Sequence, residues 1–175
     1  MDILSLGLIQ VYTGNGKGKT TASLGLAMRA LGHGYKVIII QFMKGWEGYG
    51  EIKSAEKLGL KMVRFGRASF VDRNNPDEED VKEAKRGLKF AYEVISSGEY
   101  DMVILDEINV ALDYKLLSLD EVLSLMEVKP PHVELVLTGR YAHAKVVERA
   151  DLVSEVIEIK HPYSKGIEMR RGVDY

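Results

Sequence analysis

The sequence of 175 residues contains no cysteine. Disulfides, thiolate zinc sites, iron–sulfur clusters and cysteine nucleophiles are therefore excluded, and the composition fits a reducing compartment such as the cytoplasm. Charge of one sign is also scarce, because 24 Lys and Arg residues oppose 26 Asp and Glu residues, for a net charge of −2. Without surplus cations to neutralise phosphates, no nucleic-acid partner is expected. Uninterrupted apolar runs reach only four residues, as in Val37–Ile40, so no membrane-spanning segment or membrane partner is expected.

Apolar runs of strand length alternate along the chain with segments of helical periodicity. Strands are predicted over residues 8–13, 36–43, 61–65, 101–106, 133–138 and 153–160. The consecutive apolar residues Val37–Ile40 are typical of a strand buried on both faces, as in a parallel sheet. With no internal repeat or linker, residues 1–175 are predicted to form a single α/β domain, doubly wound, with a mostly parallel central sheet flanked by helices.

The helices of this alternation carry their own start signals. One is expected from the glycine-rich loop through Leu31, a weak one over residues 52–58 and a short one over residues 143–150. Asn75 is expected to cap a longer helix, because Pro76 suits a first helical position and acidic residues follow it. Ser118 and Glu121 form a capping box for the next helix.

The strongest functional signal is a glycine- and lysine-rich loop between the first strand and the first helix. Its candidate ligand-binding residues are Gly14, Asn15, Gly16, Lys17, Gly18, Lys19, Thr20 and Thr21. Backbone N–H groups of such a loop close around phosphate oxygens, Lys19 supplies a positive charge, and the Thr20 hydroxyl can bind Mg²⁺. The common spacing G-x-x-x-x-G-K-S/T would require glycine at position 13, where this chain has threonine, so the loop is a variant. The alternative interpretation is a glycine-rich turn with exposed lysines.

Three further groups are weighed against ordinary structural roles. Asp106 and Glu107 end an apolar strand, where a carboxylate can bind Mg²⁺ directly or through water, or can simply begin a surface loop. Arg140 follows the next strand and either contacts phosphate or is an exposed arginine after a turn. Arg29, on the first helix, is taken alone as a surface residue or part of an ion pair. Because no protein nucleophile stands out, a second substrate or water is expected to attack the nucleotide.

Several motifs together closely resemble the phosphate-loop type of ATP:cob(I)alamin (corrinoid) adenosyltransferases. They are residues 13–21, 27–34, 41–45, 105–107, 138–140 and 160–163, with Gly166 and residues 172–175, and they cover nearly the whole chain in order. The resemblance implies a RecA-like phosphate-loop fold, a homodimer, and transfer of the 5′-deoxyadenosyl group of ATP to the Co(I) of a reduced corrinoid or cobalamin. Triphosphate would be the leaving group, and a flavoprotein-type reductant would supply Co(I).

The same resemblance implies roles for individual residues. The loop from Gly14 to Thr21 would bind triphosphate, with Lys19 neutralising its charge, and Thr20 would bind Mg²⁺ with Glu107 or Asp106. Arg29 is a weaker candidate for an ATP contact.

One segment departs from the family pattern. Members often carry Phe-Thr-Trp after the third strand, whose aromatic rings help to displace the lower ligand of the corrinoid. Here the segment reads Ala-Ser-Phe-Val-Asp over residues 68–72, and the single tryptophan of the chain is Trp46. Phe70 is therefore the candidate wedge against the corrinoid; the alternative is that its ring anchors the loop to the domain.

Two other functions fit the same loop. An ordinary phosphate-loop kinase or ATPase would release ADP, and a nucleotide-dependent corrinoid-binding module would bind ATP without turnover. The adenosyltransferase predicts inorganic triphosphate and an adenosylated corrinoid.

Overall fold

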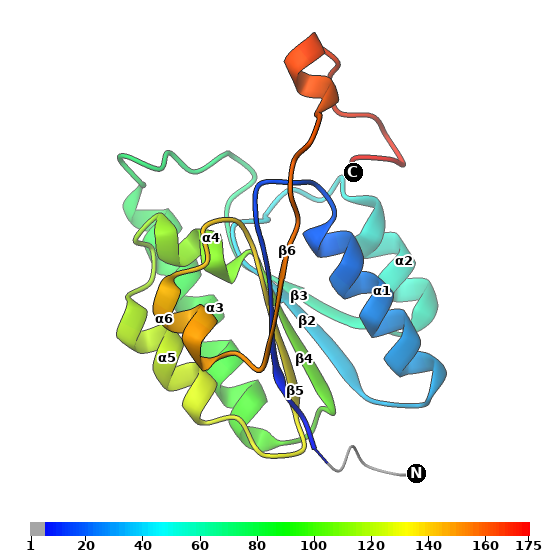
Figure 1. Cartoon of the computed structure of the whole chain (residues 1–175), viewed down its shortest axis with the longest axis vertical. Helices are drawn as coiled ribbons and strands as arrows, with labels where there is room; N and C mark the ends of the chain where they lie inside the picture. The colour runs from blue at the N-terminus through cyan, green and yellow to red at the C-terminus, as the bar shows by residue number, and fades with distance from the viewer. Residues whose placement is uncertain (1–5) are drawn as a thin grey trace.

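The computed structural model describes residues 6–175. Within this part of the chain one sheet has six strands in the order β3-β2-β4-β5-β1-β6, and all neighbouring strands are parallel (Figure 1). The strands are β1 (Ile9–Thr13), β2 (Val37–Gln41), β3 (Lys61–Arg64), β4 (Met102–Asp106), β5 (Glu134–Thr138) and β6 (Leu152–Glu155). The predicted α/β fold with a parallel central sheet is confirmed.

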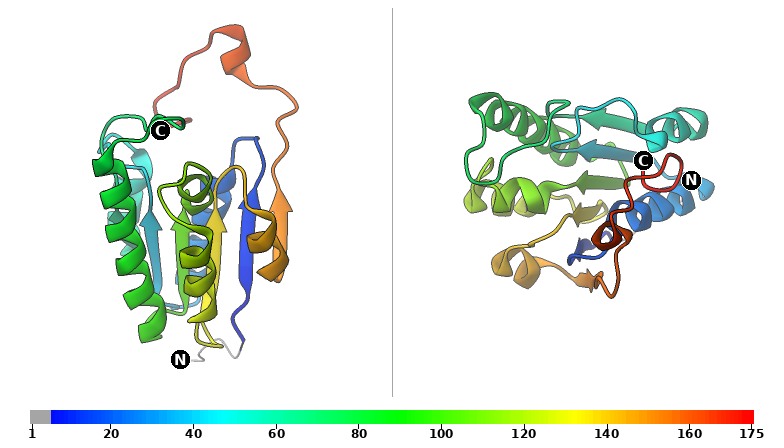
Figure 2. Two further views of the ribbon diagram at one scale, coloured as in Figure 1. Left: turned by 90° about the vertical axis from the view of Figure 1, so that its left-hand side faces the viewer. Right: turned by 90° about the horizontal axis from the view of Figure 1, so that it is seen from above.

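Helices cover both faces of the sheet, as the view from above makes clear (Figure 2). One face carries α1 (Lys19–Gly32) and α2 (Gly50–Leu58). The other carries α3 (Glu78–Ser97), α4 (Ile108–Asp113), α5 (Leu119–Glu127) and α6 (Ala144–Arg149). Of these, only α4 was not predicted, because six residues are too few to show a helical period.

Successive residues of the central strands supply two separate cores. In β2, Ile38 and Ile40 belong to the core under α3 to α6, whereas Val37 and Ile39 belong to the core under α1 and α2. This follows from the two-residue period of a strand, whose side chains alternate between the faces. Burial of each such side chain contributes about 1.5–3 kcal/mol, which explains why the central strands read as unbroken apolar runs.

The N-terminus of α3 corrects one prediction. The cap is Asp77 rather than Asn75, and the helix begins at Glu78. The Asp77 side chain accepts a hydrogen bond from the Glu79 N–H, while the Asp80 carboxylate accepts one from the Asp77 N–H. This reciprocal capping box satisfies two N–H groups at once, which a cap at Asn75 followed by proline does not offer.

The last strand is also shorter than predicted. It ends at Glu155, not at residue 160, because its partner β1 ends at Thr13 and turns into the glycine-rich loop. The apolar residues Ile157 and Ile159 therefore extend the alternating pattern without being buried. The chain continues past the carboxyl ends of the strands, forms the short 3-10 helix η1 (Pro162–Lys165) and turns back above the sheet (Figure 1).

No helix in residues 6–175 is long and apolar enough to cross a membrane.

Candidate functional site

The glycine-rich loop joins β1 directly to α1. Gly18 has φ 123°, a conformation that disfavours side chains, and it is the residue before the helix. Within the described chain no side chain caps this helix. Its first N–H groups are therefore available to an anionic ligand, and the helix dipole favours negative charge there.

Two other glycines of the loop are required by a neighbouring segment. A Cβ atom on Gly14 would lie 2.4 Å from the Val156 carbonyl oxygen, and one on Gly16 would lie 2.8 Å from the Ile157 carbonyl. The Gly16 N–H donates a hydrogen bond to Val156 O at 2.7 Å. The variant loop thus packs its glycines against the chain that follows β6.

Lys19 is folded back into its own loop. Its ammonium donates to the carbonyl oxygens of Gly14 at 2.7 Å and Gly16 at 2.6 Å, and the residue is 7% exposed. Burial lowers the pKa of Lys19, and the nearby Arg140 lowers it further, against the raising effect of Glu107 and Asp106. Phosphate oxygens would be stronger partners for this ammonium than two neutral carbonyls.

Asp106, at the end of β4, is the centre of a hydrogen-bond cluster. It is fully buried, and its Oδ1 accepts from the hydroxyls of Thr20 at 2.9 Å and Thr138 at 2.6 Å. Its Oδ2 accepts from Gln41 Nε2 at 3.0 Å and Lys44 Nζ at 2.7 Å. Burial by itself raises the pKa of Asp106, but the charge of Lys44 and these hydrogen bonds hold it below its usual value. Asp106 is therefore a carboxylate at neutral pH.

Gln41, Lys44 and Thr138 were not predicted as individual site residues. Gln41 ends β2 opposite Asp106 in the β2·β4 register, and Thr138 ends β5 on the other side of β4. Their shared signal in the sequence is a polar residue directly after a buried apolar run. Although burial lowers the pKa of Lys44, the charges of Asp106 and Glu107 raise it above its usual value, so Lys44 is cationic.

Glu107 follows Asp106 in a strained backbone conformation. Its φ is 64°, in the left-handed region, and its N–H donates to Thr138 Oγ1 at 3.1 Å. Burial raises the pKa of Glu107, and the charge of Asp106 raises it further, opposed by Lys44, Lys19 and Arg140. A non-glycine residue held at positive φ is rare and often marks a functional position.

The remaining predicted residues lie at different distances from this cluster. Arg140 is exposed, and its charge reaches Lys19 and Glu107. Arg29 lies in the last turn of α1, and its charge acts on Tyr12 instead of on the loop. The structure therefore does not bring Arg29 to the glycine-rich loop.

Phe70 lies on the loop after β3, at the same end of the sheet (Figure 1). Its side chain is 92% exposed, so the alternative in which the ring anchors the loop is wrong. The loop is held instead by Arg67, which binds Asp80 through Nε at 2.7 Å and Nη2 at 2.8 Å, and by Arg73, which pairs with Asp113 at 2.9 Å.

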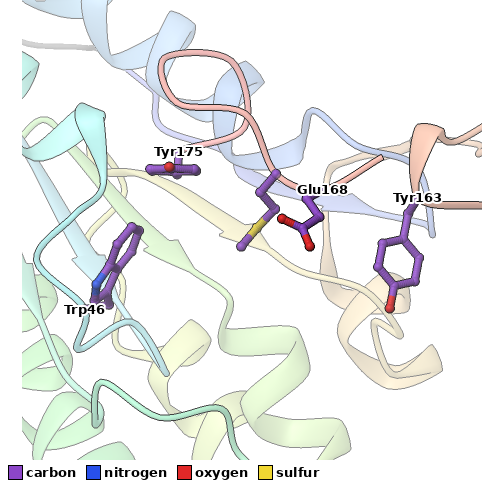
Figure 3. Close-up of a pocket in the computed structure, with 5 residues that line it drawn as sticks. Trp46, Tyr163, Glu168 and Tyr175 are labelled. Carbon is purple, nitrogen blue, oxygen red and sulfur yellow. The ribbon is translucent and has the colours of Figure 1, made fainter. Parts of the chain in front are cut away.

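The end of the chain passes beside the loop. The exposed loop residue Lys17 pairs with Asp174, whereas Asn15 and Thr21 are exposed. The ring of Tyr175 meets that of Trp46 edge-on, with centroids 5.2 Å apart. Together with Tyr163, Glu168 and Met169, these two rings line an open pocket of about 360 Å³ (Figure 3).

Comparison with known proteins agrees with this geometry. Residues 5–175 match the family model described as ATP:corrinoid adenosyltransferase BtuR/CobO/CobP. The chain belongs to this family. Adenosyl transfer from ATP to a corrinoid is accordingly its class of reaction.

Individual relatives cover almost the whole chain. The corrinoid adenosyltransferase of Escherichia coli is 37% identical over 169 residues, which is 97% of this chain and 86% of the relative. Corrinoid adenosyltransferase CobA of Salmonella typhimurium is 36% identical over the same shares, and the Pseudomonas aeruginosa enzyme is 34% identical over 97% of this chain and 84% of its own.

Among solved structures, a KaiC-like protein from Pyrococcus horikoshii matches with a TM-score of 0.56 and 16% identity, over 89% of this chain and 75% of that one. This likeness concerns the fold alone, and it confirms the RecA-like architecture.

Proposed function

We propose that the carboxyl edge of the sheet binds ATP and a reduced corrinoid and transfers the 5′-deoxyadenosyl group to cobalt, with triphosphate as the leaving group. The observation that carries this assignment is one juxtaposition. The uncapped N-terminus of α1, with Lys19 enclosed by its loop, lies beside the pair formed by Thr20 and Asp106.

In this reaction Co(I) is the nucleophile. Its electron pair forms the bond to the ribose C5′ while the C5′–O bond breaks, and the electrons of that bond leave on triphosphate. The protein then needs no nucleophilic side chain, and its task is to align the substrates and to stabilise the departing charge. We assign the second task to Lys19, which exchanges the carbonyls of Gly14 and Gly16 for triphosphate oxygens, and to the N–H groups of residues 14–21.

Mg²⁺ belongs to this proposal, and the chemistry of the donor atoms supports it. Thr20 donates its hydroxyl proton to Asp106, which leaves the oxygen lone pairs for a ligand, and Gln41 Oε1 is buried without a partner in the described structure. Oxygen donors such as these suit a hard cation that keeps several waters and also binds phosphate. No group of three or more His, Asp or Glu side chains gathers as a metal cluster within residues 6–175, so the triphosphate would complete the ligand set.

When bound, Mg²⁺ would neutralise charge on the triphosphate. Thr20 and Glu107 are our candidates for direct ligands. Asp106 already accepts hydrogen bonds from four side chains, which favours contact through water.

The corrinoid is assigned to the loop that carries Phe70. An apolar ring pressed on the lower face of the corrinoid would exclude the axial ligand and water, and phenylalanine has no lone pair with which to coordinate cobalt. The 92% exposure of Phe70 supports this role, since the ring is free to meet a substrate. Arg67 and Arg73 fix the two ends of the loop.

The homodimer and the flavoprotein-type reductant remain part of the proposal. Leu152 and Val153 on the edge strand β6 are each 41% exposed, and Ile157 and Ile159 beyond it are 71% and 86% exposed. Apolar side chains along an unpaired strand edge support a contact with a second copy. Light scattering of the purified chain tests this point through the mass in solution.

The decisive experiment identifies the phosphate product. The chain is incubated with ATP, Mg²⁺ and chemically reduced corrinoid, and the products are separated by anion-exchange chromatography. We expect triphosphate and an adenosylated corrinoid in equal amounts, with loss of both in Lys19→Ala. Release of ADP would assign a kinase or ATPase, and ATP binding without any product would assign a binding module.

A further inference from the structure

Lys44 lies within the proposed metal site. Its ammonium is 2.7 Å from Asp106 Oδ2 and 3.3 Å from Thr20 Oγ1, the two groups that a phosphate-loop metal would use. The Lys44 side chain is 13% exposed, and that of Asp106 is fully buried. The contact is thus a buried, charge-assisted pair and not a surface encounter.

The direction of the hydrogen bonds shows what Lys44 competes for. Thr20 donates its single hydroxyl proton to Asp106 at 2.9 Å, so Thr20 can meet Lys44 only as an acceptor. The ammonium therefore uses the lone pairs with which Thr20 would bind a cation. One lysine charge occupies both the Thr20 oxygen and the free side of the Asp106 carboxylate.

The backbone holds Lys44 at this position. The Lys44 N–H donates to Phe65 O at 3.2 Å, and the Phe42 N–H donates to Asp106 O at 2.9 Å. Met43, between them, has φ 59°, which turns the chain where β2 ends. The Lys44 ammonium also lies 5.5 Å from the centroid of the Tyr49 ring.

From these contacts we infer that Lys44 is a built-in competitor for the divalent cation: its ammonium fills the cation position of the nucleotide-free enzyme, so the metal enters only together with a polyphosphate. The inference rests on the proposed function, in which Mg²⁺ binds at Thr20. A polyphosphate provides what the bare metal lacks, namely anionic oxygens that can accept the displaced ammonium. Without them, metal binding would leave Lys44 beside a divalent cation and without its carboxylate partner, which is unfavourable in a buried site.

The test measures metal binding without turnover. Mn²⁺ alone is titrated into the nucleotide-free full chain, and free Mn²⁺ is followed by electron paramagnetic resonance. We expect the wild-type chain to bind Mn²⁺ at this site only when ATP is added. Lys44→Met, which keeps the length of the side chain and removes its charge, should bind Mn²⁺ alone with an affinity at least about tenfold higher than the wild type. Lys44→Arg, which keeps the charge, should behave as the wild type.

Lys129→Met is the matched control. The Lys129 ammonium is also largely enclosed, by the carbonyls of Gly7, Pro130 and Val133, but it lies at the opposite end of the sheet. It should lower stability without any gain in Mn²⁺ affinity. A gain in both lysine variants would show a general effect of destabilisation and would overturn the inference.

Two other results would overturn it. Tight Mn²⁺ binding by the nucleotide-free wild type would show that Lys44 does not exclude the cation, and this measurement requires no variant to fold. Equal Mn²⁺ affinity of Lys44→Met and the wild type would show that another feature controls metal entry. Failure of the proposed function is separate, because it appears as missing triphosphate in the product assay while Mn²⁺ binding still depends on Lys44.

Discussion

Replacing the Asp106 carboxylate by an amide tests the centre of the site. In Asp106→Asn the amide oxygen can keep the hydrogen bonds from Thr20 and Thr138, which both reach Oδ1. The new NH₂ group then faces Gln41 Nε2 and Lys44 Nζ, which are donors at 3.0 and 2.7 Å in the wild type. Donors would face a donor, and the buried ammonium would lose its counter-charge.

The expected cost follows from this arrangement. Removing one partner of a buried ion pair costs about 3–5 kcal/mol, because it leaves the other charge uncompensated. Lys44 is 13% exposed at its side chain and can partly reach water, so we expect the lower end, about 3 kcal/mol. This is a large fraction of the roughly 5–15 kcal/mol that stabilises a typical domain, yet the variant should still fold.

The assay is urea denaturation at pH 7, followed by circular dichroism. Glu127→Gln is the control, because Glu127 pairs with Arg149 where both side chains are at least half exposed, and such a pair contributes less than about 1 kcal/mol. In the double variant of Asp106→Asn with Lys44→Met, the cost should be smaller than the sum of the single costs. A loss below about 1 kcal/mol in Asp106→Asn, or strict additivity in the double variant, would refute this account of the cluster.

Four further variants test the remaining assignments. Lys19→Ala should lower kcat/KM at least about 10- to 100-fold, since a charge-assisted contact contributes roughly 1.5–3 kcal/mol or more in a preorganised site. Glu107→Gln should raise the Mg²⁺ concentration required for half-maximal activity, because amides are poorer ligands for a hard cation. Phe70→Ala should lose activity strongly when the assay starts from Co(II) with a protein reductant, and much less when Co(I) is supplied. Asp80→Asn should lower stability at pH 7 and have little effect in acid: the hydrogen bonds from Arg67 hold the Asp80 pKa below 3.8, so the wild type has this stabilisation above pH 3.8 and loses it as pH falls through the lower, folded-state pKa.

Each of these expectations has a contrary result. Near-normal turnover in folded Lys19→Ala would remove the loop from triphosphate binding, and an unchanged Mg²⁺ requirement in Glu107→Gln would place the metal elsewhere. Equal activity losses of Phe70→Ala with Co(II) and Co(I) would separate Phe70 from ligand displacement. A pH-independent stability difference between Asp80→Asn and the wild type would contradict the pKa argument.

The fold was predictable where a local pattern and the tertiary environment agree. The strand at residues 37–41 is an unbroken apolar run, and both of its faces are in fact buried. Predictions failed where two local signals compete or where a partner is needed. Asn75 and Asp77 are both capable caps, and the capping box with Asp80 decides for Asp77. The alternating pattern after Glu155 looks like strand, but β1 has no residues left to pair with it.

The site was only partly predictable, for a reason that concerns the order of the strands. The glycine-rich loop and the acidic pair each follow one strand, so they can be found from the sequence alone. The role of Gln41 depends on β2 lying beside β4, and that of Thr138 depends on β5 lying on the other side. Strand order is a property of the whole sheet and cannot be read from any one segment, so these residues were not recognised as partners of Asp106.

The same strand order accounts for the different environments of the two acids. Because β4 lies between β2 and β5, its last residue, Asp106, receives donors from both neighbours as well as from α1, and all its acceptor positions are used. Glu107 is one residue further on, where the chain leaves the sheet at positive φ, and it has the charges of Lys19 and Arg140 near it. A carboxylate whose oxygens are already occupied orients its neighbours, whereas one at the end of a strand can turn toward an incoming ligand. On this argument Asp106 orients Thr20 and Lys44, and Glu107 is the acid that meets the metal.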